Sequence, residues 1–160
     1  MKYLRIAILL VMALCLALLI VLAVNKKGGE KGGFIPPEFD ENAVKGTPVF
    51  DFEEDSFVTA KMSDSLSVSF CGLSHVTDEG ALLFFTADQN NAGNVLVRIF
   101  DEDGNEIGRS GLIRPGEYVR AVKIDGEHKT GEYKLKISSY EDGTYYSLGH
   151  AAANVIIVFE

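Results

Sequence analysis

The segment DEDGNE concentrates oxygen-bearing side chains that could bind a cation. Asp101, Asp103 and Asn105 are spaced like the first three ligands of a helix-flanked calcium loop. Such a loop also needs Gly at its sixth position and Glu at its twelfth, where this chain has Glu106 and Leu112. The flanking residues alternate like strands, and the Asp-Gly dipeptide favours a tight turn. The pattern therefore favours a hairpin tip, with a weak calcium site on the same turn as the alternative.

The other reactive residue types are too dispersed to define a catalytic or metal site. Cys71 and His75 could be two metal ligands, but a zinc site needs three or four, and the other histidines lie in separate segments. The sequence GRSGL departs from a nucleophile elbow because its last position is Leu112. We therefore expect a protein that is not an enzyme and that holds no cofactor except, at most, weakly bound calcium.

Three tyrosines around the turn EDGT form a second candidate site. They are Tyr140, Tyr145 and Tyr146. Tyrosine supplies a large contact area and is enriched in protein interfaces. It also covers the rims of β cores, with its ring inside and its hydroxyl at the surface. The residue types leave both interpretations open, an interface or a core rim.

Short apolar runs separated by turn residues must position these side chains. From residue 48 onward apolar and polar residues alternate, and no window has the 3.6-residue period of a helix. The expected strands cover 48–52, 56–61, 66–71, 80–88, 94–101, 116–124, 131–140 and 151–160. Their number and spacing predict an all-β fold, an antiparallel β-sandwich of seven to nine strands.

An unbroken apolar run, from Ile6 to Val24, precedes this region. As a helix it would be about 28 Å long, close to the ~30 Å hydrocarbon core of a bilayer. The run is longer than the apolar part of most cleaved signal peptides, so we favour a single-pass signal anchor, a transmembrane helix over residues 1–24. Two alternatives stay open. They are cleavage after Ala23 and lipid attachment at Cys15, although Leu14 is not the small residue that this attachment needs.

Residues 25–47 are rich in Gly, Pro and charged residues, which predicts a flexible linker before a domain over 48–160. The Lys and Arg residues around the apolar run are too evenly distributed for the positive-inside rule to fix an orientation. A single N-terminal anchor followed by one folded domain usually places that domain outside the cytoplasm. We therefore expect a single-pass protein of the plasma membrane with its C-terminal domain outside the cytoplasm.

The folded part is strongly acidic and contains one cysteine. Residues 34–160 contain 10 Lys and Arg against 22 Asp and Glu, a net charge of −12. Nucleic-acid phosphates and anionic lipid headgroups repel such a domain, so we expect no nucleic-acid partner. Cys71 has no second cysteine to pair with in this region, so the core alone must hold the fold.

The order of strands and turns resembles that of immunoglobulin-like modules on bacterial surface and secreted proteins. The resemblance covers residues 48–160 and rests on the D-x-D-G hairpin, GLIRPGEY, TGEYKLKI and a final apolar strand. The chain is similar above all to small membrane-anchored proteins of Gram-positive bacteria. The resemblance implies an extracytoplasmic binding or assembly module with no shared catalytic residues. The absence of Trp and of a cysteine pair departs from antibody domains.

These observations lead to one main hypothesis and two alternatives. The main hypothesis is a membrane-anchored interaction module that binds an unidentified protein partner or serves as an accessory subunit of an envelope assembly. Its binding surface would be the loops near 72–79, 101–106 and 140–148, or an exposed sheet edge. The first alternative is a module that binds a cation or small ligand, such as calcium or carbohydrate, with its acidic loops. The second is a secreted soluble domain released by signal cleavage.

Overall fold

The structure of the protein is a computed structural model that describes residues 36–49, 57–63 and 66–159. The apolar run at 6–24, the first part of the expected linker and most of the expected strand at 48–52 lie outside the described residues. Among the described residues, no helix is long and apolar enough to cross a membrane. The anchor and its orientation therefore stay predictions.

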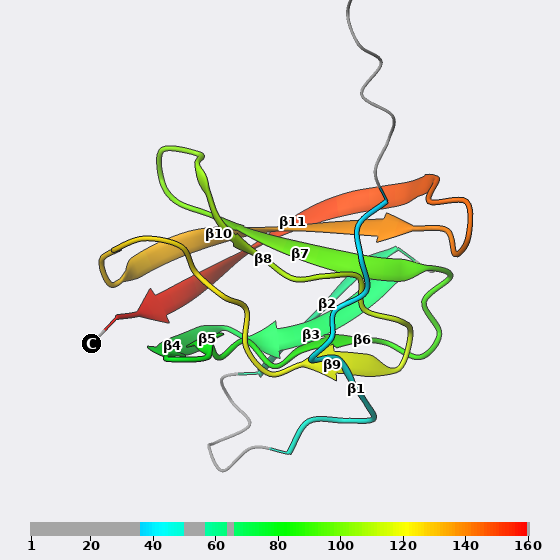
Figure 1. Ribbon diagram of the computed structural model, residues 1–160, viewed down its shortest axis with the longest axis horizontal. Helices are drawn as coiled ribbons and strands as arrows, with labels where there is room; N and C mark the ends of the chain where they lie inside the picture. Colours follow the sequence, from blue (N-terminus) through cyan, green and yellow to red (C-terminus); the bar gives the residue numbers. More distant parts are fainter. Residues whose placement is uncertain (1–35, 50–56, 64–65, 160) are drawn as a thin grey trace, which may run out of the picture. The chain divides into compact units, whose positions relative to one another are not determined.

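The described part of the chain is all-β, as its alternating sequence predicts, with eleven strands and no helix. The strands form one sheet of five and one of six (Figure 1). The first sheet has the order β1 (Val44–Lys45), β9 (Glu117–Val119), β6 (Phe85–Ala87), β3 (Leu66–Cys71) and β2 (Phe57–Ser63). The second has the order β5 (Gly80–Ala81), β4 (Leu73–Thr77), β11 (Ser147–Val158), β10 (Gly131–Tyr140), β7 (Asn94–Phe100) and β8 (Glu106–Arg109).

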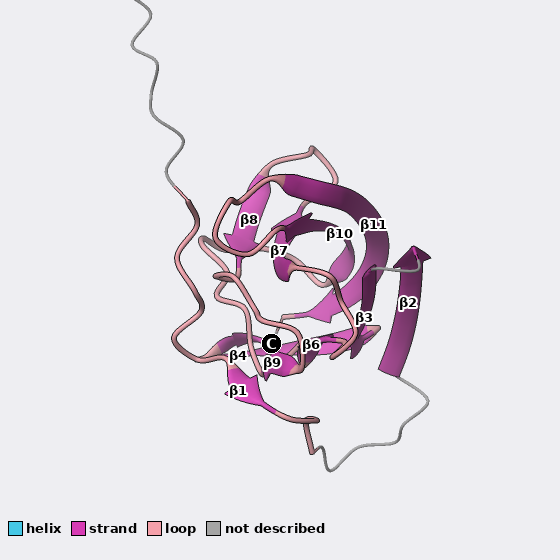
Figure 2. Cartoon of the chain, turned by 90° about the vertical axis from the view of Figure 1, so that its right-hand side faces the viewer, coloured by secondary structure: helices cyan, strands magenta, loops and turns pink. Residues whose placement is uncertain are grey.

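One apolar core is shared by the two sheets. In Figure 2, β7, β8, β10 and β11 lie above β3, β6 and β9, and β4 lies beside β9. β3 and β10 alternate between core and surface as their sequences predict. Phe70 of β3 and Leu135 and Ile137 of β10 are fully buried. Phe70 also stacks with Phe85 of β6, with ring centroids 6.5 Å apart. Burial of these apolar side chains is the main stabilising contribution to the described fold.

The chain passes from the first sheet to the second at Gly72. β3 pairs with β2 and β6, whereas β4 pairs in parallel with the C-terminal end of β11. The loop predicted at 72–79 is therefore wrong over Leu73–Thr77, and only residues 78–79 form a turn. Its sequence, LSHVT, is too polar to stand out as a strand, and the partner strand lies at the far end of the chain.

Residues 120–124 connect the two edge strands of the second sheet. Val122 forms a bridge with Ala81 of β5, and Ile124 forms one with Gly108 of β8. Two glycines allow this approach, because a Cβ at Gly80 or at Gly108 would lie 2.3 Å from a backbone oxygen of the connecting residues. The second sheet is therefore closed on this side by backbone contacts, as in a barrel.

Residues 36–45 are held against the folded part by backbone hydrogen bonds. The Leu112 amide donates to the Glu38 carbonyl at 2.8 Å, and the Asp40 amide donates to the Leu112 carbonyl at 2.9 Å. The Gly111 amide donates to Asp40 Oδ2 at 2.8 Å, and the Arg114 guanidinium lies 3.7 Å from the centre of the Phe39 ring. Composition assigns these residues to a linker, but composition does not show backbone pairing of this kind.

Several strand ends differ from the sequence pattern. The expected strand at 80–88 is divided into β5 and β6, and Phe84 between them has a φ of 46°. The expected strand at 116–124 is limited to β9 and the two bridges that follow it. β11 begins at Ser147, before the expected start at Ala151.

Candidate functional site

The β7–β8 hairpin brings Asp101, Asp103 and Asn105 together at its tip, which confirms the predicted hairpin. The Asp101 carboxylate closes the turn. Its Oδ1 accepts from the Asn105 amide at 2.7 Å, and its Oδ2 accepts from Asn105 Nδ2 at 3.0 Å. The side-chain hydrogen bond from Asn105 is the largest cause that lowers the pKa of Asp101, and backbone amides of the turn lower it further.

The hairpin tip forms one wall of an acidic cleft of about 420 Å³, and the connection from β9 to β10 forms the other wall. The carboxylates in its lining belong to Asp101, Glu102, Asp103, Glu127 and Glu132. The same lining contains His128 and Lys129. The excess of carboxylates favours cationic over anionic ligands.

Three aromatic side chains pack together at this end of the second sheet. The ring of Tyr133 lies 6.4 Å from that of His128 and 5.9 Å from that of Phe159, measured between centroids. The Tyr133 hydroxyl donates to the Lys129 carbonyl at 2.6 Å. Burial raises the pKa of Tyr133, and the nearby negative charge of Asp101 and Glu102 raises it further. These contacts join the β9–β10 connection to the end of β11.

The geometry at the tip gives calcium little support beyond its negative charge. Both carboxylate oxygens of Asp101 already accept hydrogen bonds from Asn105, so an ion would have to compete with them. Within the described residues, no three His, Cys, Asp or Glu side chains converge in a group that could hold a metal ion. The weak calcium site stays a prediction.

The loop at 140–148, which carries the tyrosines, lies at the opposite end of the second sheet from the β7–β8 hairpin (Figure 1). Tyr140 is the register partner of Asn94, at the start of β7, whereas the hairpin tip follows Phe100 at the end of β7. Tyr146 is 73% exposed, and Tyr140 and Tyr145 are half-buried. The loops at 101–106 and 140–148 therefore cannot form one common surface. Whether the tyrosines bind a partner stays a prediction.

An exposed apolar surface occurs where β4 meets β11. Leu73 and Ile156 are register partners in the parallel ladder and are 46% and 49% exposed. Leu148, near the start of β11, is 44% exposed. The alternation of apolar and polar residues does not distinguish these residues from core positions. The available signal is the run from Val155 to Ile157, in which an apolar residue stands where alternation requires a polar one.

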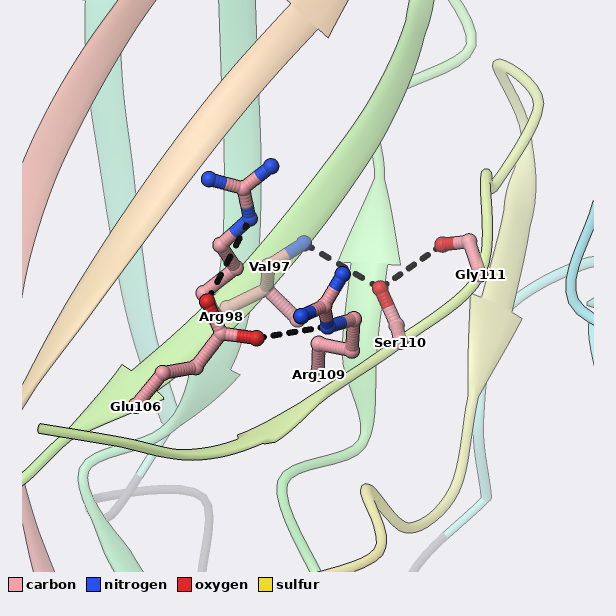
Figure 3. A network of polar contacts seen from close by, with 6 residues as sticks. All are labelled: Val97, Arg98, Glu106, Arg109, Ser110 and Gly111. Atoms are coloured by element: carbon pink, nitrogen blue, oxygen red, sulfur yellow. Dashed lines mark hydrogen bonds and ion pairs between the residues drawn. The ribbon is translucent and has the colours of Figure 1, made fainter. Parts of the chain in front are cut away.

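A polar network fixes β8 and the residues after it onto β7 (Figure 3). Glu106 forms ion pairs with Arg109 and with Arg98, whose Nε lies 3.8 Å from Glu106 Oε2. Ser110 Oγ accepts from the Val97 amide at 3.1 Å and donates to the Gly111 carbonyl at 2.7 Å. Its members pair with one another across the hairpin, so we assign the network a structural role.

A second cleft, of about 350 Å³, lies beside residues 120–123. Its lining mixes Arg109, Arg120 and Lys123 with Asp40 and Glu79. Arg120 and Glu79 form an ion pair with a nitrogen–oxygen distance of 3.4 Å. The cleft therefore has no dominant charge that would select one class of ligand.

Cys71 and His75 are in different environments. Cys71 is 1% exposed, and burial raises the pKa of its thiol to about 11. His75 is exposed on β4. Cys71 is therefore a core residue. A thiol with this pKa is neutral at neutral pH, so it is a poor nucleophile and a poor metal ligand.

No family model, curated protein or solved structure matches this chain. Its fold and surfaces define an all-β protein of two sheets, with an acidic cleft at one end and exposed apolar residues along its last strand.

Proposed function

We propose that this chain is a membrane-anchored, extracytoplasmic interaction module that binds another protein and catalyses no reaction. The observation that carries the proposal is the exposed apolar surface of β4 and β11. Leu73 and Ile156 are adjacent and each about half exposed, although polar residues dominate the outward positions of the neighbouring β10. Neighbouring exposed apolar side chains on a sheet are a feature of protein interaction surfaces.

We further propose that the fold is an immunoglobulin-like β-sandwich. Its variable-type form has a sheet in which the last strand is followed by the strands F, C and C′. Here β11, β10, β7 and β8 occur in that order. The antiparallel neighbours β3, β6 and β9 correspond to the strands A, B and E of the opposite sheet. The remaining strands, β1, β2, β4 and β5, are additions to this scheme.

A cation-binding module is the second candidate function. The specific observation in its favour is the acidic cleft, which places carboxylates from the β7–β8 hairpin opposite those of the β9–β10 connection. A carbohydrate ligand lacks a comparable observation, because the exposed Tyr146 is a single ring and the chain contains no Trp. A secreted form of the domain would carry the same surfaces.

The location can be tested with one outward-facing, half-buried cysteine in the full-length protein. Ser138→Cys lies on the outer face of β10, and Cys15→Ser in the same chain removes the other reactive thiol. A membrane-impermeant maleimide should label this variant in intact cells as strongly as after lysis. Labelling only after lysis would place the domain in the cytoplasm and overturn the proposed location.

The binding surface can be tested with a photoreactive amino acid placed in cells at Leu73 or Ile156. We expect covalent adducts with a protein from both positions. Lys134, an exposed residue on the adjacent strand β10 that does not line the acidic cleft, is the matched control and should give much weaker adducts. An equal yield from all three positions, or none from any, would contradict an interface at this surface.

A further inference from the structure

Among the described residues, only β4 pairs with the edge of β11 that faces away from β10, and most of that edge is open. β10 pairs with β11 along the whole of β10, but β4 covers only Ile156–Val158 on the other side. The Ile156 amide donates to the Gly72 carbonyl at 2.9 Å, so the backbone groups of Ile156 point away from β10, toward β4. Because the pattern repeats every two residues, the backbone groups of His150, Ala152 and Asn154 point the same way. None of them has a hydrogen-bond partner there among the described residues.

This open edge lacks the features that usually prevent strand pairing. Proteins protect edge strands with charged residues, proline or a covering segment. From Ser147 to Phe159 the chain contains no Asp, Glu, Lys, Arg or Pro. By contrast, the edge strand β2 includes Lys61, and β8 is bridged by Ile124. The edge of β11 is therefore suited to accept another strand.

The core is also incompletely covered beside this edge. Ala151 and Ala153 are the register partners of the buried Ile137 and Leu135, so they face the core side of the sheet. Both are only half-buried. A strand added at this edge would cover them and extend the sheet.

We propose that the β11 edge binds the β11 edge of a second copy of this chain, antiparallel and centred on Ala152. This register joins the backbones of the two copies of Ala152. It also pairs His150 of each copy with Asn154 of the other copy. The outward backbone groups of all three residues then form hydrogen bonds between the copies. On the core side of the joined sheet, Ala151 of each copy lies opposite Ala153 of the other.

A second copy fits better than an unrelated peptide for two reasons. An antiparallel edge is complementary to itself about a two-fold axis, so identical chains match donors to acceptors without any further requirement. The side chains at the centre of this edge are alanines, which offer no pockets to select a different sequence. The exposed Leu148 of one copy would approach Leu73 and Ile156 of the other. This inference rests on the proposed interaction function and names its partner.

The first test is disulfide cross-linking of the full-length protein in isolated membranes, with Cys15→Ser as background. Residues directly opposite in an antiparallel pair have Cα atoms within the range that a disulfide spans. Ala152→Cys should therefore give a covalent dimer after oxidation. Ser138→Cys is the control, because it lies on the same outer face but one strand further from the two-fold axis of the proposed dimer. It should give only a trace of covalent dimer. No dimer from Ala152→Cys would overturn the proposal.

The register can be tested by placing like or opposite charges at His150 and Asn154. The comparison of two variants at the same positions separates an effect of charge pairing from a loss of folding. Added to Ala152→Cys, the pair His150→Glu and Asn154→Glu places like charges opposite each other and should abolish the cross-link. The pair His150→Lys and Asn154→Glu places opposite charges there and should restore it. Equal cross-linking by both variants, or an Ala152→Cys adduct with a different protein, would refute the self-pairing. An Ala152→Cys adduct with a different protein would leave the proposed interaction function intact. If the maleimide labels the domain only after lysis but the Ala152→Cys dimer forms, the proposed location is refuted and the self-pairing stands.

Discussion

At the residue scale, the carboxylate of Asp101 decides whether the tip of the β7–β8 hairpin can bind calcium. Its two oxygens hold the Asn105 amide and side chain, so the turn is complete without an ion. We expect the same melting temperature of the full-length protein with calcium and with a chelator. A rise of several degrees with calcium that disappears in Asp101→Asn and in Asp103→Asn would establish the cation site instead.

The same hydrogen bonds predict a pH dependence. The pKa of Asp101 is lower in the folded protein than in the unfolded chain. Its contribution to stability is therefore present above the unfolded pKa, near 3.9, and is lost as the pH falls through the folded pKa. Titration of the side chain by NMR should give a midpoint below the usual value. An Asn105→Ala variant should move the midpoint back toward that value, and an unchanged midpoint would refute the assigned cause.

The thiol of Cys71 gives a prediction of the opposite sign. Burial raises its pKa from 9.0 to about 11, so its contribution to stability is complete below pH 9 and is lost as the pH rises toward 11. In a Cys15→Ser background we expect a disulfide reagent at neutral pH to leave the folded protein unmodified. Unfolding in denaturant should make the thiol react at once. Fast reaction of the folded protein would show that the core around β3 opens readily.

At the scale of secondary-structure elements, the Asp40 carboxylate adds two hydrogen bonds to the backbone pairing that holds the segment 36–45. Its Oδ2 accepts from the Gly111 amide and its Oδ1 from the Asn42 amide. Asp40→Ala should lower the free energy of unfolding by about 1–2 kcal/mol, because the part-buried Gly111 amide loses its acceptor. Glu41→Ala removes the same charge from an exposed turn and is the control. Equal effects of the two substitutions on the urea midpoint would argue against a structural role for Asp40.

The strands themselves were largely predictable, and their partners were not. LSVSFC and GEYKLKISSY alternate so regularly that β3 and β10 have the predicted bounds. β4 was missed because its short polar sequence is stabilised by pairing with β11, which is remote in the chain. The residues 36–45 were assigned to the linker because their contacts are made by the backbone. Local patterns report the faces of a strand but not the strand beside it.

The candidate sites show the same limit. The sequence identifies the hairpin tip at 101–105 from turn chemistry alone, and the structure confirms it. It does not show that Glu127 and Glu132 join the tip in one cleft, or that the tyrosines lie at the other end of β10. Those relations follow from the register of β7, β10 and β11. The exposed position of Ile156 likewise follows from the register, which places it on the outer face of the sheet between Glu132 of β10 and Leu73 of β4.

At the scale of the whole molecule, two places in the chain decide which edges of the second sheet are covered. One is Gly72, where the chain changes sheets, and the other is the contact of residues 120–124 with β5 and β8. At the first, β4 pairs only with Ile156–Val158, so the described residues leave most of the β11 edge uncovered. The second covers the opposite edges of the same sheet. The fold is thus closed on one side and open on the side where we place the second copy.

The contact of residues 120–124 with β5 can be tested by substituting two glycines that have nearly equal φ angles. Gly80 has a φ of +122° and Gly46 a φ of +119°, so alanine is strained by about 1–3 kcal/mol at either position. Only at Gly80 would the new Cβ also meet a backbone oxygen, that of Val122 at 2.3 Å, whereas nothing lies within 4 Å at Gly46. Gly80→Ala should therefore cost about 1–3 kcal/mol more than Gly46→Ala in the free energy of unfolding. Equal losses in urea unfolding would mean that residues 120–124 do not hold this side closed. A larger loss at Gly80 would show that residues 120–124 pack tightly against β5.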